Sequence, residues 1–448
     1  MKETKFNGYG LEWKEAVSSS QICVIGMGYV GLTLSVVLAD RGFTVLGIDK
    51  EEEKVSLLNK GVTPIFEPGV AELLEKYLGK RIFIQGFYPE KLPATVIICV
   101  STPVESHKKK PIFSNLVDAS REIAARLQEL SLVIVRSTVP VGATRKTVLP
   151  LLKEKVAKVK LAFCPERTIQ GQAVKELQEL PQIIGGWDDE SVRAATELFE
   201  KVTPLIVPVS SLEAAEMVKL ICNSYTDLIY GYGNEVALMA EKFGLDPIEL
   251  IESANLNYPR PDLNLPGFVG GGCLSKDPYL LMSSFDDSNY TPRLVKNARD
   301  LNESMPVHVA KRVIERLKSM GKDPQKAKVF VAGFAYKGSP ITDDTRGTPA
   351  LPFVEYLNRY VPSIFGHDFM VSSDKIKAMG AIPCSLEEGF AGADCVVFLN
   401  NHPSYKELDI SALVEMMRKP ALIIDCWRLF DGKELSRIDS LVYGSIGV

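Results

Sequence analysis

The sequence lacks long apolar runs and lacks an excess of charge of one sign. No stretch approaches the roughly 18 consecutive apolar residues that a membrane-spanning helix needs. A formal net charge of -4 over 448 residues gives no basic surface of the kind that binds nucleic acid. Residues 1–20 are polar and charged, without the apolar segment of a signal peptide. We therefore expect a cytoplasmic protein that has neither a nucleic acid nor a membrane as partner.

Cysteine and histidine are present but scattered. The 8 cysteines form no CxxC and no paired spacing, which argues against a disulfide framework or a zinc site. The 4 histidines do not stand in ligand spacing either. We expect no metal, and we expect most of the thiols to be buried.

The length and composition predict a multidomain globular protein. A chain of 448 residues is too long for one hydrophobic core, and 46% hydrophobic with 24% charged residues is an ordinary globular composition. Changes in periodicity along the chain divide it into three predicted regions, which are residues 1–210, 211–322 and 323–448.

Residues 21–31, QICVIGMGYVG, form an apolar run that breaks into glycines before a helix-like segment. Gly26 permits a tight turn, Gly28 lets a pyrophosphate approach the backbone, and Gly31 allows close helix packing. Asp49 ends the next apolar run, where a carboxylate accepts hydrogen bonds from ribose hydroxyls and repels a 2'-phosphate. This pattern predicts NAD, although Lys50 and Lys54 are nearby cations that would weaken the repulsion. The expected NAD contacts here are Gly26, Gly28, Tyr29, Val30, Gly31, Asp49 and Lys54.

Apolar runs then alternate with helix-like segments, which is typical of a parallel sheet. From residue 211 to 244 apolar residues recur every three or four positions and predict one long helix, and a second helix is expected over 291–320. We predict an α/β fold with two Rossmann-like doubly wound domains joined by a long central helix. The predicted strands of the first domain after the NAD motif are 94–100, 132–137, 161–165, 182–186 and 204–209, and those of the second are 328–333, 363–368, 395–400 and 421–426.

Cys273 differs from the other cysteines because it follows three glycines, in PGFVGGGCLSKDP. Glycines before a thiol leave room for a substrate, and uncovered backbone N–H groups stabilise an oxyanion. The same residues also suit a turn with a bystander cysteine.

Other polar residues occupy positions where ligands often bind. Lys219 and Asn223 share a face of the long helix, and Glu166 and Thr138 follow predicted strands. Each has a simpler interpretation: Lys219 pairs with Glu216 in solvent, Glu166 lies in an exposed loop, and Thr138 caps a helix.

Taken in order, several motifs resemble the UDP-glucose/GDP-mannose dehydrogenase family of nucleotide-sugar 6-dehydrogenases. The resemblance extends over nearly the whole chain, and the final motif is very specific. The motifs are GMGYVG, FEPG (66–69), STP (101–103), STVPVG (137–142), CPER (164–167), the helix with Lys219 and Asn223, GGGCLSKD (270–277) and GFAYKGSPITDDTRGTP (333–349).

The resemblance implies a four-electron oxidation of a UDP-sugar at C6 with NAD as acceptor. Cys273 would trap the aldehyde as a thiohemiacetal, and the resulting thioester would be hydrolysed to a uronic acid. Lys219 and Asn223 would stabilise the oxyanion, Asp277 and Thr138 would position a water, and Glu166 would be the base for hydrolysis. Thr102 and Arg346 would also contact NAD, and the second α/β domain, residues 323–448, would hold the UDP-sugar. The implied substrate contacts are Arg167, Arg260, Gly271, Gly272, Phe334 and Lys337.

The resemblance also bears on assembly and on the sugar. Arg260 resembles an arginine that acts on the substrate of a neighbouring subunit, so a helical dimerisation region and a homodimer or dimer of dimers are expected. The segment after Glu166 is similar to the UDP-N-acetylhexosamine branch, whereas Lys276 and Asp277 are similar to the UDP-glucose branch. UDP-N-acetylmannosamine, UDP-N-acetylglucosamine, UDP-N-acetylgalactosamine and UDP-glucose remain open. A two-electron β-hydroxyacid-type dehydrogenase and a non-catalytic sensor of NAD and nucleotide sugar are the alternatives.

Overall fold

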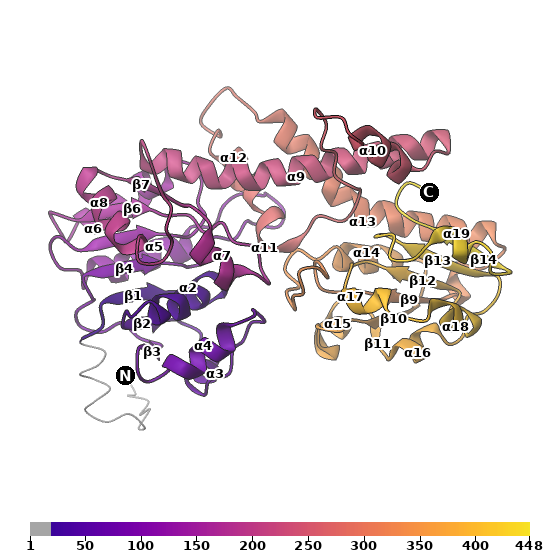
Figure 1. Ribbon diagram of the computed structural model, residues 1–448, viewed down its shortest axis with the longest axis horizontal. Coiled ribbons are helices and arrows are strands. Elements are labelled where there is room, and N and C mark those ends of the chain that lie inside the picture. Colours follow the sequence, from indigo (N-terminus) through magenta and orange to yellow (C-terminus); the bar gives the residue numbers. More distant parts are fainter. Residues whose placement is uncertain (1–18) are drawn as a thin grey trace. The chain divides into compact units, whose positions relative to one another are not determined.

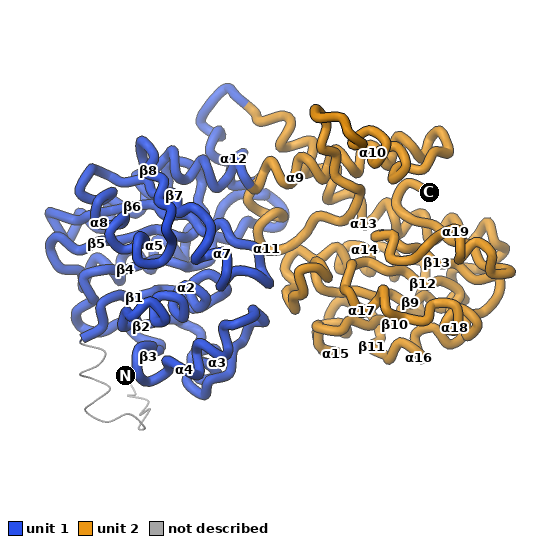
Figure 2. Tube along the Cα trace, in the orientation of Figure 1, with its two compact units in different colours: residues 1–222, 279–290 blue, residues 223–278, 291–448 orange. Residues whose placement is uncertain are grey.

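The computed structural model describes residues 19–448 in two compact units. Unit 1 comprises residues up to 222 together with 279–290, and unit 2 comprises 223–278 and 291–448 (Figure 2). Most of the polar opening segment therefore lies outside the described residues. Among the described residues, none of the helices has the length and apolar character needed to cross a membrane.

Unit 1 is built on an eight-stranded sheet with the order β3-β2-β1-β4-β5-β6-β7-β8 (Figure 1). All neighbouring pairs from β3 to β6 are parallel, as the alternation of strands and helices predicts. The strands are β1 (Ile22–Ile25), β2 (Val45–Ile48), β3 (Ile82–Gln85), β4 (Thr95–Ile98), β5 (Leu132–Val135), β6 (Lys160–Phe163), β7 (Gln182–Gly186) and β8 (Ile206–Val209).

Strand β7 is antiparallel to β6, so the expectation of a wholly parallel sheet is wrong at this point. The reason is where β7 starts. The Gln182 side chain bonds to the Pro165 carbonyl and to Arg136, both just beyond the carboxyl ends of neighbouring strands. Because β7 begins at the edge where β6 ends, it runs in the opposite direction, and apolar patterning carries no information on strand direction.

Helices cover both faces of this sheet. Alternate residues of β1 enter two different hydrophobic clusters, with Ile22 and Val24 in one and Cys23 and Ile25 in the other. The helices are α2 (Tyr29–Asp40), α3 (Glu52–Asn59), α4 (Val70–Tyr77), α5 (Ser114–Ala124), the π-helical turn η1 (Thr144–Val148), α6 (Leu149–Lys153), α7 (Ala173–Glu179) and α8 (Asp189–Phe199).

A short separate segment completes unit 1. Residues 279–290 contain most of α12 (Asp277–Ser283). The Val141 N–H donates to the Ser284 hydroxyl at 2.9 Å, and Lys110 pairs with Asp286 at 2.6 Å. These bonds join the segment to the loops after β4 and β5.

The long helix predicted over 211–244 is confirmed as α9 (Leu212–Phe243), and the helix over 291–320 is confirmed as α13 (Arg293–Ser319). Helix α9 passes from unit 1 into unit 2 at residue 222. Both helices supply apolar side chains to unit 2, where Ala237 and Val309 belong to the same core cluster.

Unit 2 contains the second α/β domain, with a sheet in the order β11-β10-β9-β12-β13-β14. Its strands are β9 (Lys328–Ala332), β10 (Ser363–His367), β11 (Ile382–Pro383), β12 (Cys395–Phe398), β13 (Ala421–Asp425) and β14 (Leu441–Gly444). Its remaining helices are α10 (Pro247–Asn255), α11 (Gly271–Leu274), the 3-10 turn η2 (Pro324–Lys326), α14 (Ala350–Leu357), α15 (Ser373–Ala378), α16 (Leu386–Phe390), α17 (Pro403–Lys406), α18 (Ile410–Glu415) and α19 (Gly432–Leu435). The predicted fold class is confirmed, but strands β3, β11 and β14 were not predicted.

Candidate active site

The glycine turn after β1 has the geometry that a dinucleotide needs. Gly26 has a φ of +93°, and a Cβ there would lie 2.7 Å from the Cys99 carbonyl oxygen. A Cβ on Gly31 would lie 1.8 Å from the Gly26 oxygen, whereas a Cβ on Gly28 would meet nothing within 4 Å. Gly26 and Gly31 are therefore required by packing, and Gly28 leaves open space at the start of α2, where Tyr29 and Val30 form the first turn.

Asp49 lies at the carboxyl end of β2 and is buried. Its Oδ2 accepts from the Met27 N–H at 2.8 Å and from the Lys54 ammonium at 3.0 Å, and its Oδ1 accepts from the Glu51 N–H at 3.0 Å. A carboxylate has about four acceptor positions, so Asp49 keeps capacity for a ribose hydroxyl. Lys54 therefore faces this carboxylate, and its contact with NAD stays a prediction.

A buried ion pair occupies the edge of the sheet beyond β5 and β6. Arg136 donates to Glu166 Oε2 at 2.7 Å, and the Thr168 N–H donates to Oε1 at 2.6 Å. Burial by itself raises the pKa of Glu166, but Arg136, the Thr168 N–H and the Lys219 charge outweigh it and lower that pKa to about 2. Glu166 is therefore not an exposed loop residue, and it is held as a carboxylate.

Lys219 is buried, with 6% of its surface exposed, so the interpretation of a solvated lysine is wrong. Glu216, one turn earlier, accepts instead from the backbone N–H groups of Gly142 and Thr144, at 2.5 and 2.8 Å. These bonds join α9 to the loop that carries Thr138. Burial raises the pKa of Glu216 to about 7, against the lowering effect of those hydrogen bonds.

Two predicted threonines meet in unit 1. The Thr102 hydroxyl donates to the Thr138 carbonyl, which joins the loops after β4 and β5. Thr138 and Arg167 are both partly exposed at this edge of the sheet. Glu67, in the FEPG motif, accepts from the N–H groups of Gly171 and Ala173 at 2.8 Å each, and so holds the loop after Arg167.

Cys273 is the exposed cysteine of this chain, and the other seven are buried or partly buried. Burial raises the pKa of Cys99 and of Cys164 to about 12, which makes both inert thiols. Cys273 lies in the short helix α11 of unit 2. Its exposure distinguishes it from the other thiols as the one accessible to a ligand.

The glycines before Cys273 were expected to leave room for a sugar, but other parts of this chain occupy the position that a Cβ would take at each of them. A Cβ on Gly271 would lie 2.7 Å from the Tyr336 ring, and one on Gly272 would lie 2.9 Å from the Arg346 guanidinium carbon. A Cβ on Gly270 would lie 2.4 Å from the Gly347 oxygen. The three glycines are instead required because the loop packs directly against the segment 336–347.

Charged groups surround the base of the cysteine loop. Asp277 is fully buried and accepts from Asn223 Nδ2 and from the Lys276 ammonium, both at 2.5 Å. Burial would lower the pKa of Lys276, but the Asp277 carboxylate and the Cys273 thiolate outweigh it and raise that pKa. Lys276, which was not among the predicted site residues, thus places a cation near Cys273.

The remaining predicted ligand contacts in unit 2, which are three substrate contacts and the NAD contact Arg346, differ in exposure. Phe334 is fully buried in the core, so its side chain is not available to a ligand. Lys337 is partly exposed, and Arg346 has a side chain 57% exposed that forms a bidentate pair with Asp344. Arg260 is exposed and lies over the Tyr258 ring at 5.1 Å.

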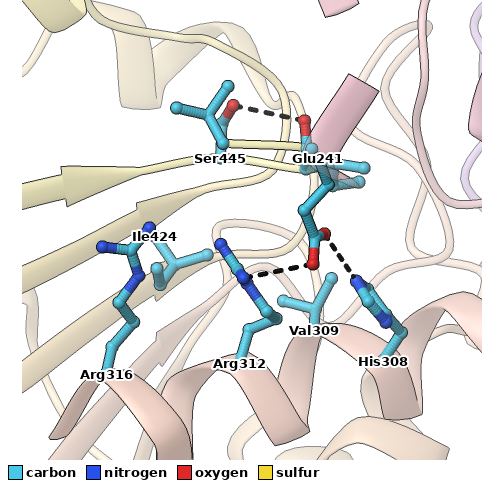
Figure 3. Close-up of a pocket in the computed structure, with 10 residues that line it drawn as sticks. Glu241, His308, Val309, Arg312, Arg316, Ile424 and Ser445 are labelled. Carbon is cyan, nitrogen blue, oxygen red and sulfur yellow. Dashed lines mark hydrogen bonds and ion pairs between the residues drawn. The ribbon is translucent and has the colours of Figure 1, made fainter. Parts of the chain in front are cut away.

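Arg136 and Glu216 were also not predicted as site residues. A signal existed for Arg136, because it directly follows β5 at the edge where ligands bind in such sheets. A small pocket elsewhere in unit 2 contains none of the predicted residues. It is lined by Glu241, His308 and Arg312, with both basic side chains directed at the Glu241 carboxylate (Figure 3).

The chain is similar to known proteins along most of its length. Three domains described under the UDP-glucose/GDP-mannose dehydrogenase family match, namely the NAD binding domain at residues 20–203, the central domain at 213–304 and the UDP binding domain at 330–432. A UDP-N-acetyl-D-mannosamine dehydrogenase of Pyrococcus horikoshii is 35% identical over 412 residues, 90% of this chain and 94% of the relative.

Solved structures agree with this family. A UDP-D-ManNAc dehydrogenase structure from Pyrococcus horikoshii aligns with a TM-score of 0.86 and 33% identity, covering 95% of this chain and 99% of that one. The UDP-N-acetyl-mannosamine dehydrogenase of Staphylococcus aureus aligns with a TM-score of 0.82 and 26% identity, covering 96% and 98%. The chain therefore belongs to the UDP-glucose/GDP-mannose dehydrogenase family and is an NAD-dependent UDP-sugar dehydrogenase.

Proposed function

We propose that this protein oxidises the C6 hydroxyl of UDP-N-acetylmannosamine to the carboxylate, in two oxidations that each use one NAD. The observation that carries the proposal is the similarity, over 90% of the chain, to a relative named for that substrate. UDP-N-acetylglucosamine, UDP-N-acetylgalactosamine and UDP-glucose are the competing substrates, because the orientation of one hydroxyl depends on pocket geometry.

The residues around the glycine turn fit the cofactor. Gly28 leaves the open space, the start of α2 presents backbone N–H groups, and Asp49 has remaining acceptor capacity. When bound, NAD supplies the hydride acceptor for each oxidation. All remaining chemistry falls to side chains of this chain.

Cys273 is proposed as the nucleophile. Its thiolate sulfur forms a bond to the C6 aldehyde carbon, and Lys219 and Asn223 donate hydrogen bonds to the oxygen that becomes negative. After the second oxidation the carbon is a thioester, and water attacks it, releases the thiolate and leaves the carboxylate. Exposure of the thiol and the nearby Lys276 cation support this role.

Asp277 and Thr138 are proposed to position water, and Glu166 to act on the water that cleaves the thioester. A carboxylate whose pKa is about 2 accepts a hydrogen bond from water better than it removes a proton. We therefore assign Glu166 to orienting that water, in place of the general base first expected.

Glu166→Gln should slow thioester cleavage, so that intact-protein mass spectrometry detects a sugar adduct on Cys273. Impaired turnover without an adduct would assign Glu166 another step.

We also propose a homodimer, or a dimer of dimers, formed through α9. Tyr225, Tyr232 and Met239 are seven residues apart on this helix and are 63%, 50% and 49% exposed, and Phe243 is 79% exposed. Such a stripe of exposed apolar side chains on one helix marks an interface. Arg260 would then serve the neighbouring subunit. A Tyr225→Glu/Tyr232→Glu variant should be monomeric by light scattering.

A cytoplasmic location and the three predicted regions, 1–210, 211–322 and 323–448, stay predictions.

The test of the reaction is the amount of NADH formed per sugar consumed, with excess NAD and each of the four UDP-sugars. Two NADH per UDP-N-acetylmannosamine would support the proposal, and two for another sugar would change the substrate. One NADH would indicate an aldehyde product or β-hydroxyacid-type chemistry. No NADH with any sugar, despite NAD binding, would favour the sensor. Cys273→Ser should bind UDP-sugar and form no acid, and unchanged turnover would refute the covalent step.

A further inference from the structure

The loop that carries Cys273 is anchored by a buried polar network in unit 2. The network consists of two residues of α9 and two of α13, and each of the four has at most 1% of its surface exposed. They are Asp227 and Asn234 on α9, and Arg299 and Asn302 on α13. We refer to these four residues as the loop anchor.

Asn234 holds the start of the loop. Its Nδ2 donates to the Gly267 carbonyl at 2.9 Å, and its Oδ1 accepts from the Gly267 N–H at 2.9 Å. The side-chain amide thus satisfies both backbone groups of one residue, as a neighbouring strand would. Gly267 is fixed in position and in orientation.

Arg299 holds the other end. Its Nη1 donates to the Leu274 carbonyl at 2.8 Å, and its Nη2 lies 3.4 Å from the Val269 carbonyl. Leu274 is the last residue of α11 and directly follows Cys273. The guanidinium therefore spans the backbone on both sides of the glycines and of the thiol.

The two ends are connected without a break. Arg299 Nη1 also donates to Asp227 Oδ1 at 2.6 Å, and Asn302 Nδ2 donates to the same oxygen at 2.9 Å. Asn234 Nδ2 donates to Asn302 Oδ1 at 2.9 Å. Hydrogen bonds therefore run from Gly267 through all four side chains to Leu274.

Stability alone does not account for this network. A buried ion pair is at best weakly stabilising relative to well-packed apolar side chains, because both charges lose their hydration. The network also leaves Asp227 Oδ2 and Arg299 Nε buried without a hydrogen-bond partner. Its distinctive effect is geometric. Apart from an ion pair within α13, where Arg299 Nε lies 3.8 Å from Glu303 Oε1, its bonds beyond α9 go to the backbone of residues 267–274.

We propose that Arg299 is a positioning residue for the reaction, which it serves by holding α11 so that the Cys273 thiol keeps a fixed orientation beside Lys276. The proposal rests on the proposed function of Cys273 as the nucleophile. Displacement of a reacting group by about 1 Å costs on the order of 100-fold in rate, so a loosened loop should lower kcat and leave substrate binding intact.

The first test is Arg299→Lys, with Arg312→Lys as its matched control. Lysine keeps the positive charge opposite Asp227 but lacks the planar fork that reaches two carbonyls at once. Arg312 lies on the same helix and pairs with Glu241 of α9 at 3.1 Å, away from the cysteine loop (Figure 3). We expect kcat for the UDP-sugar to fall about 100-fold in Arg299→Lys, KM to change less than threefold, and Arg312→Lys to match the wild type.

The second readout needs no turnover. Alkylation of Cys273 by iodoacetamide, followed by peptide mass spectrometry across pH, reports the surroundings of the thiol. In Arg299→Lys the rate should differ from that of the wild type and of Arg312→Lys, because α11 no longer holds the thiol in one orientation beside the Lys276 cation. If the wild type turns over none of the UDP-sugars, the proposed function fails, and this profile alone decides whether Arg299 positions the thiol.

Three results would overturn the proposal. One is an unchanged kcat and alkylation profile in Arg299→Lys. Another is an equal loss of kcat in Arg299→Lys and Arg312→Lys, which would mean that any disturbance of the helix pair is enough. The third concerns a second variant, for use if Arg299→Lys fails to fold.

That variant, Arg299→Met/Asp227→Leu, removes both buried charges and should fold. Full kcat in the folded double variant would overturn the proposal, and a kcat loss of about 100-fold with intact substrate binding would support positioning.

Discussion

Strands β1 of unit 1 and β9 of unit 2 hold the same place in their sheets, yet the segments that connect them to the next helix differ. Both strands are followed directly by a glycine with positive φ, +93° at Gly26 and +103° at Gly333. Helix α2 begins at Tyr29, three residues after its glycine, whereas α14 begins at Ala350, seventeen residues after Gly333. Only the first turn leads directly into a helix N-terminus, which is the kind of site that binds phosphate.

The carboxylates at the ends of the second strands differ in the same way. Asp49 accepts three hydrogen bonds, one of them from the Lys54 ammonium. Asp368 accepts five, from the N–H groups of residues 334, 335, 370 and 371 and from Asn400. A carboxylate with five donors has no acceptor position left for a ribose. The same sheet order thus supports an NAD site in one unit and a differently built nucleotide site in the other.

The largest expected effect comes from filling the turn of unit 1. Gly31→Ala places a Cβ 1.8 Å from the Gly26 oxygen and should destabilise unit 1 by about 3 kcal/mol or more and abolish NAD binding. Gly28→Ala is the control, because its Cβ meets nothing within 4 Å. It should keep the unfolding temperature and weaken only NAD binding, as measured by calorimetry. A wild-type affinity for NAD in Gly31→Ala would contradict the assignment of NAD to the turn of unit 1.

Asp368→Asn tests whether the carboxylate of unit 2 is purely structural. It removes an acceptor from at least two backbone N–H groups, so the free energy of unfolding should fall by about 2 kcal/mol. Urea denaturation measures this, with NAD titration alongside. A change in NAD affinity would show that the two carboxylates are not functionally distinct.

Asp49→Asn should change cofactor binding, in contrast to Asp368→Asn. A charged acceptor for the ribose hydroxyls is lost, so the Kd for NAD should rise about tenfold, while the affinity for NADP should rise because the repulsion of its 2'-phosphate is removed. Parallel titrations with both dinucleotides measure the ratio. An unchanged ratio would contradict the assignment of Asp49 to the ribose.

The smallest effect is expected at Lys54. Its ammonium contacts Asp49 at 3.0 Å and Glu51 at 3.1 Å, with 19% of the side chain exposed. Lys54→Met should change the Kd for NAD by about two- to threefold, since such a pair contributes at most about 1 kcal/mol. Lys50→Met is the control, because Lys50 bonds to Asn115 instead. A tenfold loss would give Lys54 a direct contact with the cofactor.

Local patterns in the sequence predicted the features that depend on local physics. The turn at Gly26, both long helices and the second α/β domain follow from periodicity and spacing, and the structure confirms them. The family itself was recognised from the order of the motifs, and the comparisons confirm it.

Features that depend on distant partners could not be predicted. A glycine before Cys273 looks the same in sequence whether it faces a sugar or the Arg346 side chain. Likewise, Asn302 bonds to Asp227 across 75 positions, and neither residue stands in a motif. Strand β7 reverses because of where Gln182 is anchored, which hydrophobic patterning does not encode.

The discontinuity of unit 1 has a consequence for its synthesis on the ribosome. The unit is made of residues up to 222 and of 279–290, so 68 further residues (222 to 290) must be made before its last segment exists. At about 5 to 20 residues per second this takes roughly 3 to 14 s, during which the nascent NAD-binding unit lacks the partner of Val141. A ribosome-bound fragment that has exposed residue 222 but not residue 279 should therefore be more sensitive to protease at the loops after β4 and β5 than one that has exposed residue 290.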